Sequence, residues 1–284
     1  MTLTSYAQNF EDVLLWRSLG DVSDGFYVDV GAQHPRIDSV SLMFHEHGWH
    51  GIHVEPSPAY VALLRAQRPG DEVIGAALGA GRGEAVFHEI EGTGLSTLAP
   101  AAMDLARARG FAVVDRTVPT LPLDDVLASV DRPIHWLKID VEGYEKCVIE
   151  GWTNAVRPWV VVIESILPGG RTEAFQDWEA DILLKGYDFV WFDGLNRFYV
   201  HNDHDDLKVH FNTPPNVFDA VALSGEATSA FGSQFRARVA QLENALAACE
   251  RRVVEQDAQA EQATGEYAQQ VAEQVFDPAV WWYD

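Results

Sequence analysis

The sequence predicts an α/β fold in which a mostly parallel sheet ends in an antiparallel hairpin and is followed by a helical C-terminal appendage. Three observations support this prediction. Short apolar runs alternate with segments of helical period, an Asp-Gly pair lies between two aromatic-rich runs, and the composition changes near residue 224. Strands that alternate with helices are typical of a parallel sheet covered by helices. A chain of 284 residues is long enough for one large domain with an appendage.

The predicted parallel strands are five apolar runs: FYVDV, GIHVE, EVIGAAL, IHWLKIDV and WVVVIES. Between the first two, SVSLMFHEHGW has a helical pattern that ends at Gly48. After the second, PSPAYVALLRAQRPG is a helix that begins at Pro58 and ends before Pro69 and Gly70. The chain therefore begins with a β-α-β-α-β unit.

The hairpin is predicted from YDFVWFDGLNRFYVHN, in which two aromatic-rich runs flank Asp193 and Gly194. An Asp-Gly pair between two such runs is a strong local hairpin signal. We expect this hairpin to complete the sheet.

The C-terminal segment is predicted to be a separate region, with a first domain at 1–223 and a helical tail at 224–284. SGEATSAFGS is small and polar, and the sequence after it is rich in Ala, Glu, Gln and Arg. Apolar residues then recur at alternating steps of four and three, which indicates a coiled coil or a long helix on another helix. They are Phe235, Val239, Leu242, Leu246, Cys249 and Val253. We expect this short helix to form a homo-oligomer or bind a partner protein; a partly ordered tail is the alternative.

The aromatic C-terminal end, VFDPAVWWYD, is expected to dock on the core or on a partner, because a solvated tail has no need of such side chains.

Charge and composition restrict the function classes. The net charge of -23 argues against nucleic-acid binding, which needs a basic face to neutralise phosphates. The two cysteines, Cys147 and Cys249, fit no zinc or disulfide spacing. The N-terminus lacks a basic segment before an apolar core, and no apolar run approaches the ~20 residues of a membrane span. We therefore expect a cytoplasmic protein without a membrane span.

Candidate functional residues lie at the strand ends, where ligands bind in open α/β sheets. Four of the five ends carry acids. The residues at the strand ends are Asp29 and Gly31, then Glu55, then Ala76, Ala77 and Leu78, then Asp140 and Glu142, and finally Glu164.

The cofactor is predicted from Gly31 and Glu55. Glu55 follows Gly31 by 24 positions, close to the ~20-residue spacing at which an acid accepts from ribose hydroxyls. Gly31 is followed by Ala32, Gln33 and His34, so the three-glycine pattern that cradles a pyrophosphate is absent. NAD and FAD are therefore disfavoured. S-adenosylmethionine, a ribose-bearing cofactor without phosphate, fits better, and nearby carboxylates would attract its positive charges.

These pieces together resemble the FkbM family of S-adenosylmethionine-dependent methyltransferases over roughly Ser5 to Ala222. The resemblance rests on SYAQNFEDVLLWR, FYVDVGAQHP, GWHGIHVEPSP, GAALGAGRGEAVFHE, LSTL, VPTLPLDDVL, LKIDVEGYEKCVIEGW and VVVIES, in that order. It implies the seven-stranded, Rossmann-like class I methyltransferase sheet with a terminal antiparallel hairpin. It also implies O-methylation of a hydroxyl of a sugar, polysaccharide or glycoconjugate, as in polysaccharide biosynthesis.

The resemblance also implies residue roles. Asp29, Gly31 and Ala32 would line the methionine end of the cofactor, Glu55 would hold the ribose, and Ala76, Ala77 and Leu78 would border the adenine. Ser96 and Thr97 would lie beside the site. Gln8, Glu11 and Asp12 match an N-terminal segment expected to close over the cofactor.

A sugar hydroxyl is a poor nucleophile, so a base or a metal is the remaining chemical requirement. Asp140, Glu142 and Glu164 are the candidates, either as acid-base groups or as oxygen ligands of Mg²⁺. Asp140 also borders the cofactor, and we expect Lys138 to form an ion pair with this cluster. His34 is a second candidate base, with structural packing as its alternative.

Two other function classes stay open at this point. One is a nucleotide-dependent oxidoreductase on a Rossmann sheet. The other is a non-catalytic, methyltransferase-like scaffold that acts through its helical tail.

Overall fold

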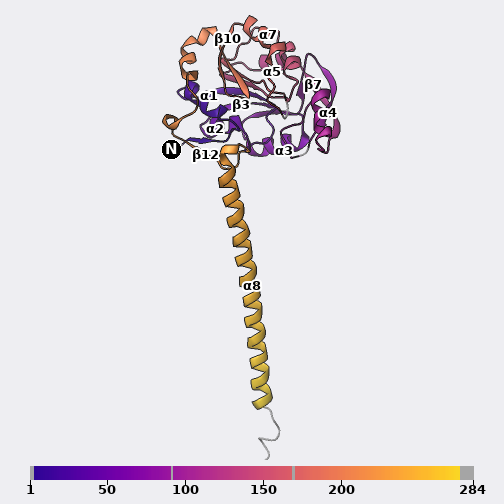
Figure 1. The fold of residues 1–284 in the computed structure, drawn as a ribbon, viewed down its shortest axis with the longest axis vertical. Coiled ribbons are helices and arrows are strands. Elements are labelled where there is room, and N and C mark those ends of the chain that lie inside the picture. Colours follow the sequence, from indigo (N-terminus) through magenta and orange to yellow (C-terminus); the bar gives the residue numbers. More distant parts are fainter. Residues whose placement is uncertain (1–2, 91, 168–169, 276–284) are drawn as a thin grey trace, which may run out of the picture. The chain divides into compact units, whose positions relative to one another are not determined.

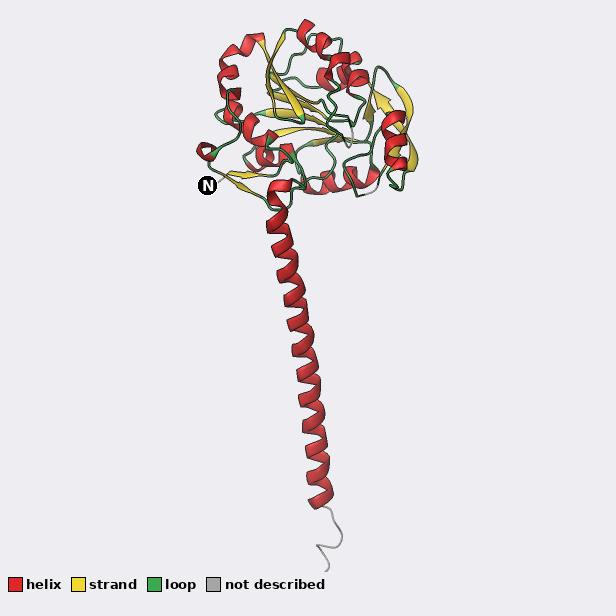
Figure 2. Ribbon diagram, viewed as in Figure 1, coloured by secondary structure: helices red, strands yellow, loops and turns green. Residues whose placement is uncertain are grey.

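The chain forms two compact units, Met1–Gly232 and Ser233–Asp284. The computed structural model describes residues 3–90, 92–167 and 170–275 (Figure 1). All the described strands belong to the first unit, and the second consists of one long helix and the residues after it (Figure 2). The first unit extends beyond the predicted boundary after residue 223. Residues 224–232 belong to the first unit, and one of them, Thr228, donates from its backbone N–H to Asp38 Oδ1 at 2.8 Å.

The main sheet has seven strands and confirms the predicted fold class. Five are parallel: β2 (Phe26–Val30), β3 (His50–Val54), β4 (Glu72–Ile74), β8 (Trp136–Ile139) and β9 (Val160–Glu164). The predicted hairpin is β10 (Tyr187–Phe192) and β11 (Asn196–His201), and β11 is antiparallel to β9. The spatial order is β10-β11-β9-β8-β2-β3-β4. The chain returns to the middle of the sheet between β2 and β8, so the ends of these two strands form the switch point at which ligands bind.

Helices cover both faces of this sheet. One face packs against α1 (Glu11–Leu19), α2 (Val40–Glu46) and the 3-10 segment η2 (Asn202–Phe211). The other packs against α5 (Leu123–Ala128), α6 (Glu145–Glu150) and α7 (Glu179–Leu184). Helix α3 (Pro58–Gln67) begins at Pro58, and α2 ends before Gly48, so both helices predicted between the first strands are confirmed.

Alternation along the strands sends side chains to the two faces. Val28 and Val30 of β2 join the cluster under α5 and α6, whereas Tyr27 joins the cluster under α1 and α2. Tyr27 stacks on Trp136 of β8 with ring centroids 4.8 Å apart. Asp29 follows the same alternation as Tyr27, which places this acid on the α1 and α2 side of the sheet.

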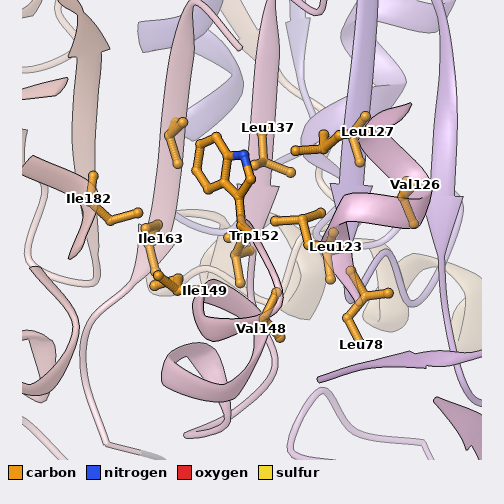
Figure 3. Close-up of a cluster of buried hydrophobic side chains, with 14 of the residues drawn as sticks. Leu78, Leu123, Val126, Leu127, Leu137, Val148, Ile149, Trp152, Ile163 and Ile182 are labelled. Atoms are coloured by element: carbon orange, nitrogen blue, oxygen red, sulfur yellow. The ribbon is translucent and has the colours of Figure 1, made fainter. Parts of the chain in front are cut away.

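The largest hydrophobic cluster is built around Trp152, which follows α6 and is fully buried (Figure 3). Aliphatic side chains of α5, α6, β8 and β9 surround its indole ring. Its Nε1 donates to the carbonyl oxygen of Val156 at 3.1 Å. The polar atom of this large side chain is therefore satisfied inside the core.

A small second sheet differs from the sequence prediction. The run EVIGAAL is not one strand: it contributes β4 to the main sheet and β5 (Ala77–Leu78) to a three-stranded sheet with β7 (Val114–Leu121) and β6 (Gly83–Glu89). Gly75 and Ala76 make the break between them. Strands β6 and β7 pair in antiparallel fashion and carry many exposed residues, so they lack the apolar pattern that marks a buried strand.

The remaining elements are short. Strands β1 (Leu3–Ser5) and β12 (Val221–Leu223) pair in parallel, and α4 (Pro100–Ala108) precedes β7. Three 3-10 turns complete the unit: η1 (Phe175–Asp177), η3 (Val217–Asp219) and η4 (Ala230–Gly232).

The second unit is the helix α8 (Ser233–Val275), which confirms the predicted C-terminal helix. Its apolar residues are exposed along its length. A search of the described helices finds none with the length and apolarity needed to cross a bilayer. Residues 276–284 of the predicted aromatic end lie outside the described residues.

Candidate functional site

The first unit contains a cavity of about 510 Å³ at the carboxyl ends of β2, β3 and β8. The structure brings the predicted site residues together along its wall; the role of each residue remains a prediction. Those that line it are Gln8, Glu11, Asp29, Gly31, Ala32, His34, Glu55, Ala76, Ala77, Leu78, Ser96, Thr97, Asp140, Glu142 and Glu164.

Gly31 makes the turn that ends β2. Its φ of +78° lies in the left-handed region that favours glycine. Its N–H donates to the carbonyl oxygen of Val54 on β3 at 2.9 Å, and the backbone of Asp140 lies directly against it. The absence of a side chain at Gly31 therefore lets the turn after β2 lie against the loop after β8.

Glu55 follows β3 as a buried carboxylate held by backbone donors. Its Oε2 accepts from the N–H of Gln33 at 2.9 Å, and its Oε1 accepts from the N–H of Ser57 at 2.8 Å. Burial raises its pKa to about 7, and the nearby charges of Glu89 and Asp29 act in the same direction. These two backbone bonds fix the orientation of the carboxyl group at the cavity wall.

Asp29 is a strand acid that is only 2% exposed. In the sheet register it lies opposite Lys138 of β8 and opposite His53 of β3. His53 Nδ1 is 3.9 Å from Asp29 Oδ2. The acid is therefore tolerated within an apolar strand because basic side chains flank it on both neighbouring strands.

Three acids, Asp140, Glu142 and Glu164, meet at the ends of β8 and β9. One carboxylate oxygen from each lies within 4.8 Å of the others. Burial, reinforced by the charge of Asp140, raises the pKa of Glu142 to about 9 and raises that of Glu164 well above its ordinary value. Oε2 of Glu142 and Oε2 of Glu164 are buried without a hydrogen-bond partner among the described residues. The acidic cluster therefore has unmet capacity to bind protons, donors or a cation.

Lys138 forms the predicted ion pair with this cluster: its Nζ lies 2.5 Å from Asp140 Oδ2. Burial alone would lower the pKa of Lys138. The carboxylates of Asp140 and Asp29 outweigh that effect and raise the pKa above its ordinary value. Lys138 thus carries a fixed positive charge at neutral pH.

The ring nitrogen of His34 that could accept a proton is already occupied by backbone hydrogen bonds. Its Nδ1 accepts from the N–H of Arg36 at 3.1 Å and from the N–H of Ile37 at 3.0 Å. In the neutral ring the hydrogen is then on Nε2, which can donate but cannot accept a proton. Burial also lowers the pKa of His34. This arrangement favours the structural alternative, in which His34 shapes the turn after Gly31.

The N-terminal residues divide into two groups. Gln8 and Glu11 line the cavity, but Asp12 does not. The carboxylate of Asp12 accepts from Ser5 Oγ at 2.8 Å and from the N–H of Tyr6 at 2.7 Å, so it holds the segment that carries Gln8. Asp12 therefore stabilises the backbone of the N-terminal segment and does not face the cavity.

Sequence reasoning missed Thr228 as a cavity residue. It lies in the small polar stretch at the start of the predicted tail, yet its Oγ1 donates to Asp38 Oδ2 at 2.7 Å and accepts from Gln8 Nε2 at 3.3 Å. No local signal marks such a residue, because its neighbours in space are about 200 positions away in sequence.

Comparison with known proteins identifies the family. The family model described as the methyltransferase FkbM domain matches residues 29–189. The chain belongs to the FkbM methyltransferase family. The matched segment begins at Asp29 and includes Gly31, Glu55, Asp140, Glu142 and Glu164. As a member of this family, the chain is an S-adenosylmethionine-dependent methyltransferase.

A search of solved structures finds a TehB-like SAM-dependent methyltransferase from Corynebacterium glutamicum. It is 10% identical with a TM-score of 0.37, and the match covers 67% of this chain and 87% of that one. No curated protein matches the chain.

Proposed function

We propose that this FkbM methyltransferase transfers a methyl group from S-adenosylmethionine to a hydroxyl oxygen of a sugar in a polysaccharide or another glycoconjugate. The supporting observation is that the acidic cluster of Asp140, Glu142 and Glu164 lines the same cavity as Glu55. Carboxylates accept hydrogen bonds from hydroxyl groups, so this wall suits a neutral polyhydroxyl acceptor. An anionic acceptor is disfavoured. Among the described residues that line the cavity, the lysine or arginine side chain is Lys138, and it is already paired with Asp140.

The cavity residues fit the cofactor. Glu55, held by two backbone donors, would accept from the ribose hydroxyls. Ala76, Ala77 and Leu78 are buried and would form an apolar border for the adenine. Asp29, Gly31 and Ala32 would face the methionine end. When bound, S-adenosylmethionine supplies an activated methyl group and leaves as a neutral thioether, so positioning contributes much of the rate.

The acceptor oxygen must lose its proton as its bond to the methyl carbon forms. Asp140 is the group we assign to the acceptor hydroxyl, because its side chain is 29% exposed and Lys138 holds its orientation. Glu142 is the second candidate, but with a pKa raised to about 9 its carboxyl group must first lose its own proton before it can act as the base. His34 is not proposed as the base, since its Nδ1 is occupied by two backbone donors.

We also propose that the acidic cluster can hold an oxygen-ligated divalent cation such as Mg²⁺. Three carboxylates that each offer one oxygen are the donor set that such a cation prefers, and Glu142 and Glu164 each have an oxygen without a hydrogen-bond partner among the described residues. A bound cation would offset the repulsion among the three acids. Calorimetric titration of Mg²⁺ into the wild type and into Glu164→Gln tests binding directly, and turnover in EDTA tests its need. Undiminished turnover in EDTA would exclude an essential metal, and absence of binding heat would exclude the site.

Two measurements test the main proposal against its alternatives. Calorimetry with S-adenosylmethionine and with NAD separates a methyltransferase from an oxidoreductase, and binding of NAD alone would contradict the proposal. Mass spectrometry of neutral sugar acceptors, incubated with enzyme and cofactor, should show a gain of one methyl group that is lost in Glu55→Ala. Cofactor binding without product on any sugar acceptor would favour the scaffold alternative.

A further inference from the structure

Helix α8 presents a row of exposed apolar side chains with a strict heptad spacing. Phe235, Val239, Leu242, Leu246 and Val253 are each more than half exposed, and Cys249 is exposed between the last two. An isolated helix has no reason to keep such residues in contact with water. Their spacing of alternating four and three residues is that of a coiled-coil seam. We use the term seam for these six residues.

The residue types in the seam favour two strands. If Phe235, Leu242 and Cys249 take the d positions, then Val239, Leu246 and Val253 take the a positions. β-Branched residues at a with leucine at d favour parallel dimers. Two of the three a positions are valine, and the central d position, Leu242, is leucine.

The charges beside the seam favour one chain direction. In a parallel pair in register, a g residue of one helix faces the e residue five positions later in the other. Here Arg238 at g would face Glu243 at e, and Arg252 at g would face Asp257 at e. Both pairs are attractive. An antiparallel pair centred on the seam would instead bring Arg238 near Arg252 and Glu243 near Glu243 of the other helix. These like charges repel, and they outnumber the attractive pair of Arg236 with Glu250.

We infer that α8 pairs with α8 of a second copy of this chain in a parallel, in-register, two-stranded coiled coil. The two methyltransferase units are then attached at the same end of the coil. After Val253 the d position becomes Gln256 and the a position Ala260, so the apolar seam is short. We expect a dimer that dissociates on dilution.

The mass of the full chain in solution tests the pairing. Light scattering over a wide concentration range should approach twice the monomer mass of 31.5 kDa at the highest concentration. A monomer throughout, or a trimer or tetramer, would overturn the inference.

Two adjacent valines provide a matched test of the seam. Val253 is 55% exposed at an a position, and Val254 is 68% exposed at a b position on the outer side of the coil. Val253→Glu should weaken the dimer at least tenfold, whereas Val254→Glu should leave the dissociation constant within about twofold, since outer positions do not contact the partner. Equal effects of the two substitutions would show that the seam is not the interface.

The direction is tested by a charge exchange and by a cross-link. Arg238→Glu should weaken the dimer, and adding Glu243→Arg should restore it, because the two positions face each other only between parallel chains. In a Cys147→Ser background, mild oxidation should link the two copies through Cys249, and Cys249→Ser should abolish the link. A dimer in which neither the restoration nor the link is observed would contradict the parallel arrangement.

Discussion

A Cβ atom on Gly31 would lie 1.8 Å from the carbonyl oxygen of Asp140. Gly31 ends β2 and Asp140 follows β8, and these two strands are neighbours in the sheet. The backbones of the two loops thus touch at the switch point, where the cofactor is expected to bind. The lone glycine after the first strand is required by this contact as well as by its φ of +78°.

Gly31→Ala should lose more than about 3 kcal/mol of unfolding free energy, because neither backbone can move away without disturbing the sheet. Cofactor binding should be lost with it. Chemical denaturation and calorimetry with S-adenosylmethionine would measure the two effects. Gly48→Ala is the matched control: Gly48 has a similar φ of +84°, but a Cβ atom there would meet no atom within 4 Å beyond its own chain neighbours. The Gly48→Ala substitution should lower the unfolding free energy only by the cost of a left-handed backbone at a residue with a side chain, about 1 kcal/mol.

Lys138→Met should destabilise the protein by about 3 kcal/mol, because it removes the cation that is paired with Asp140 and lies opposite Asp29 in the sheet register. The partial exposure of Asp140 keeps the loss at the low end of the range for buried pairs. The raised pKa of Lys138 means that its contribution is fully present at neutral pH and is lost only in strong alkali. The difference in unfolding free energy between wild type and variant should therefore stay constant around neutral pH and narrow in strong alkali, where Lys138 loses its proton.

Denaturation curves at pH 8 and at about pH 11.5, above the ordinary lysine pKa of ~10.4, would check that change. Lys138→Met with Asp140→Asn should recover part of the loss at pH 8. A gap of equal size at both pH values would show that lost packing, and not charge, accounts for the effect.

Trp152→Ala should destabilise the first unit by about 3 to 5 kcal/mol, since it opens a cavity among tightly packed aliphatic side chains (Figure 3). Trp152→Phe should lower the stability by less, because phenylalanine keeps most of the side-chain volume. The loss that remains includes the hydrogen bond to Val156. Trp152 does not line the cavity in which we propose that the cofactor binds, so the affinity of the folded Trp152→Phe variant for S-adenosylmethionine should be unchanged. Thermal unfolding and calorimetry would separate the two properties.

The sheet was predictable from the sequence because its central strands are buried on both faces and therefore appear as continuous apolar runs. The acids at their ends were predictable for the same reason, since each one interrupts or closes such a run. Strands β6 and β7 gave no comparable signal, because their pairing leaves many side chains in water.

The contacts that fix individual side chains depend on the folded backbone. His34 precedes the two N–H groups to which its Nδ1 binds, yet only the turn geometry shows that this nitrogen is occupied. Thr228 reaches the cavity because residues after β12 return to Asp38 and Gln8, which local sequence does not indicate.

Glu55 should make cofactor binding depend on pH. Its pKa of about 7 in the folded protein is above the ordinary carboxyl value because the group is buried, so folding favours the protonated form. Stability from this group is present in acid and declines as the pH rises through about 7. Cofactor binding should show the opposite trend, because an ionised carboxylate is the better acceptor for two ribose hydroxyls.

The affinity for S-adenosylmethionine should therefore rise with pH between about 6 and 8, with release of a proton from Glu55 on binding. Calorimetry at pH 6.5 in two buffers of different ionisation enthalpy would detect that proton. Glu55→Gln keeps one carbonyl oxygen as an acceptor but cannot ionise, so it should bind more weakly and with a flat pH profile. Because Glu11 is also buried with a raised pKa, Glu11→Gln serves as the control. Retention of the full pH dependence in Glu55→Gln, or its loss in Glu11→Gln, would assign the proton to Glu11 and contradict the ribose role of Glu55.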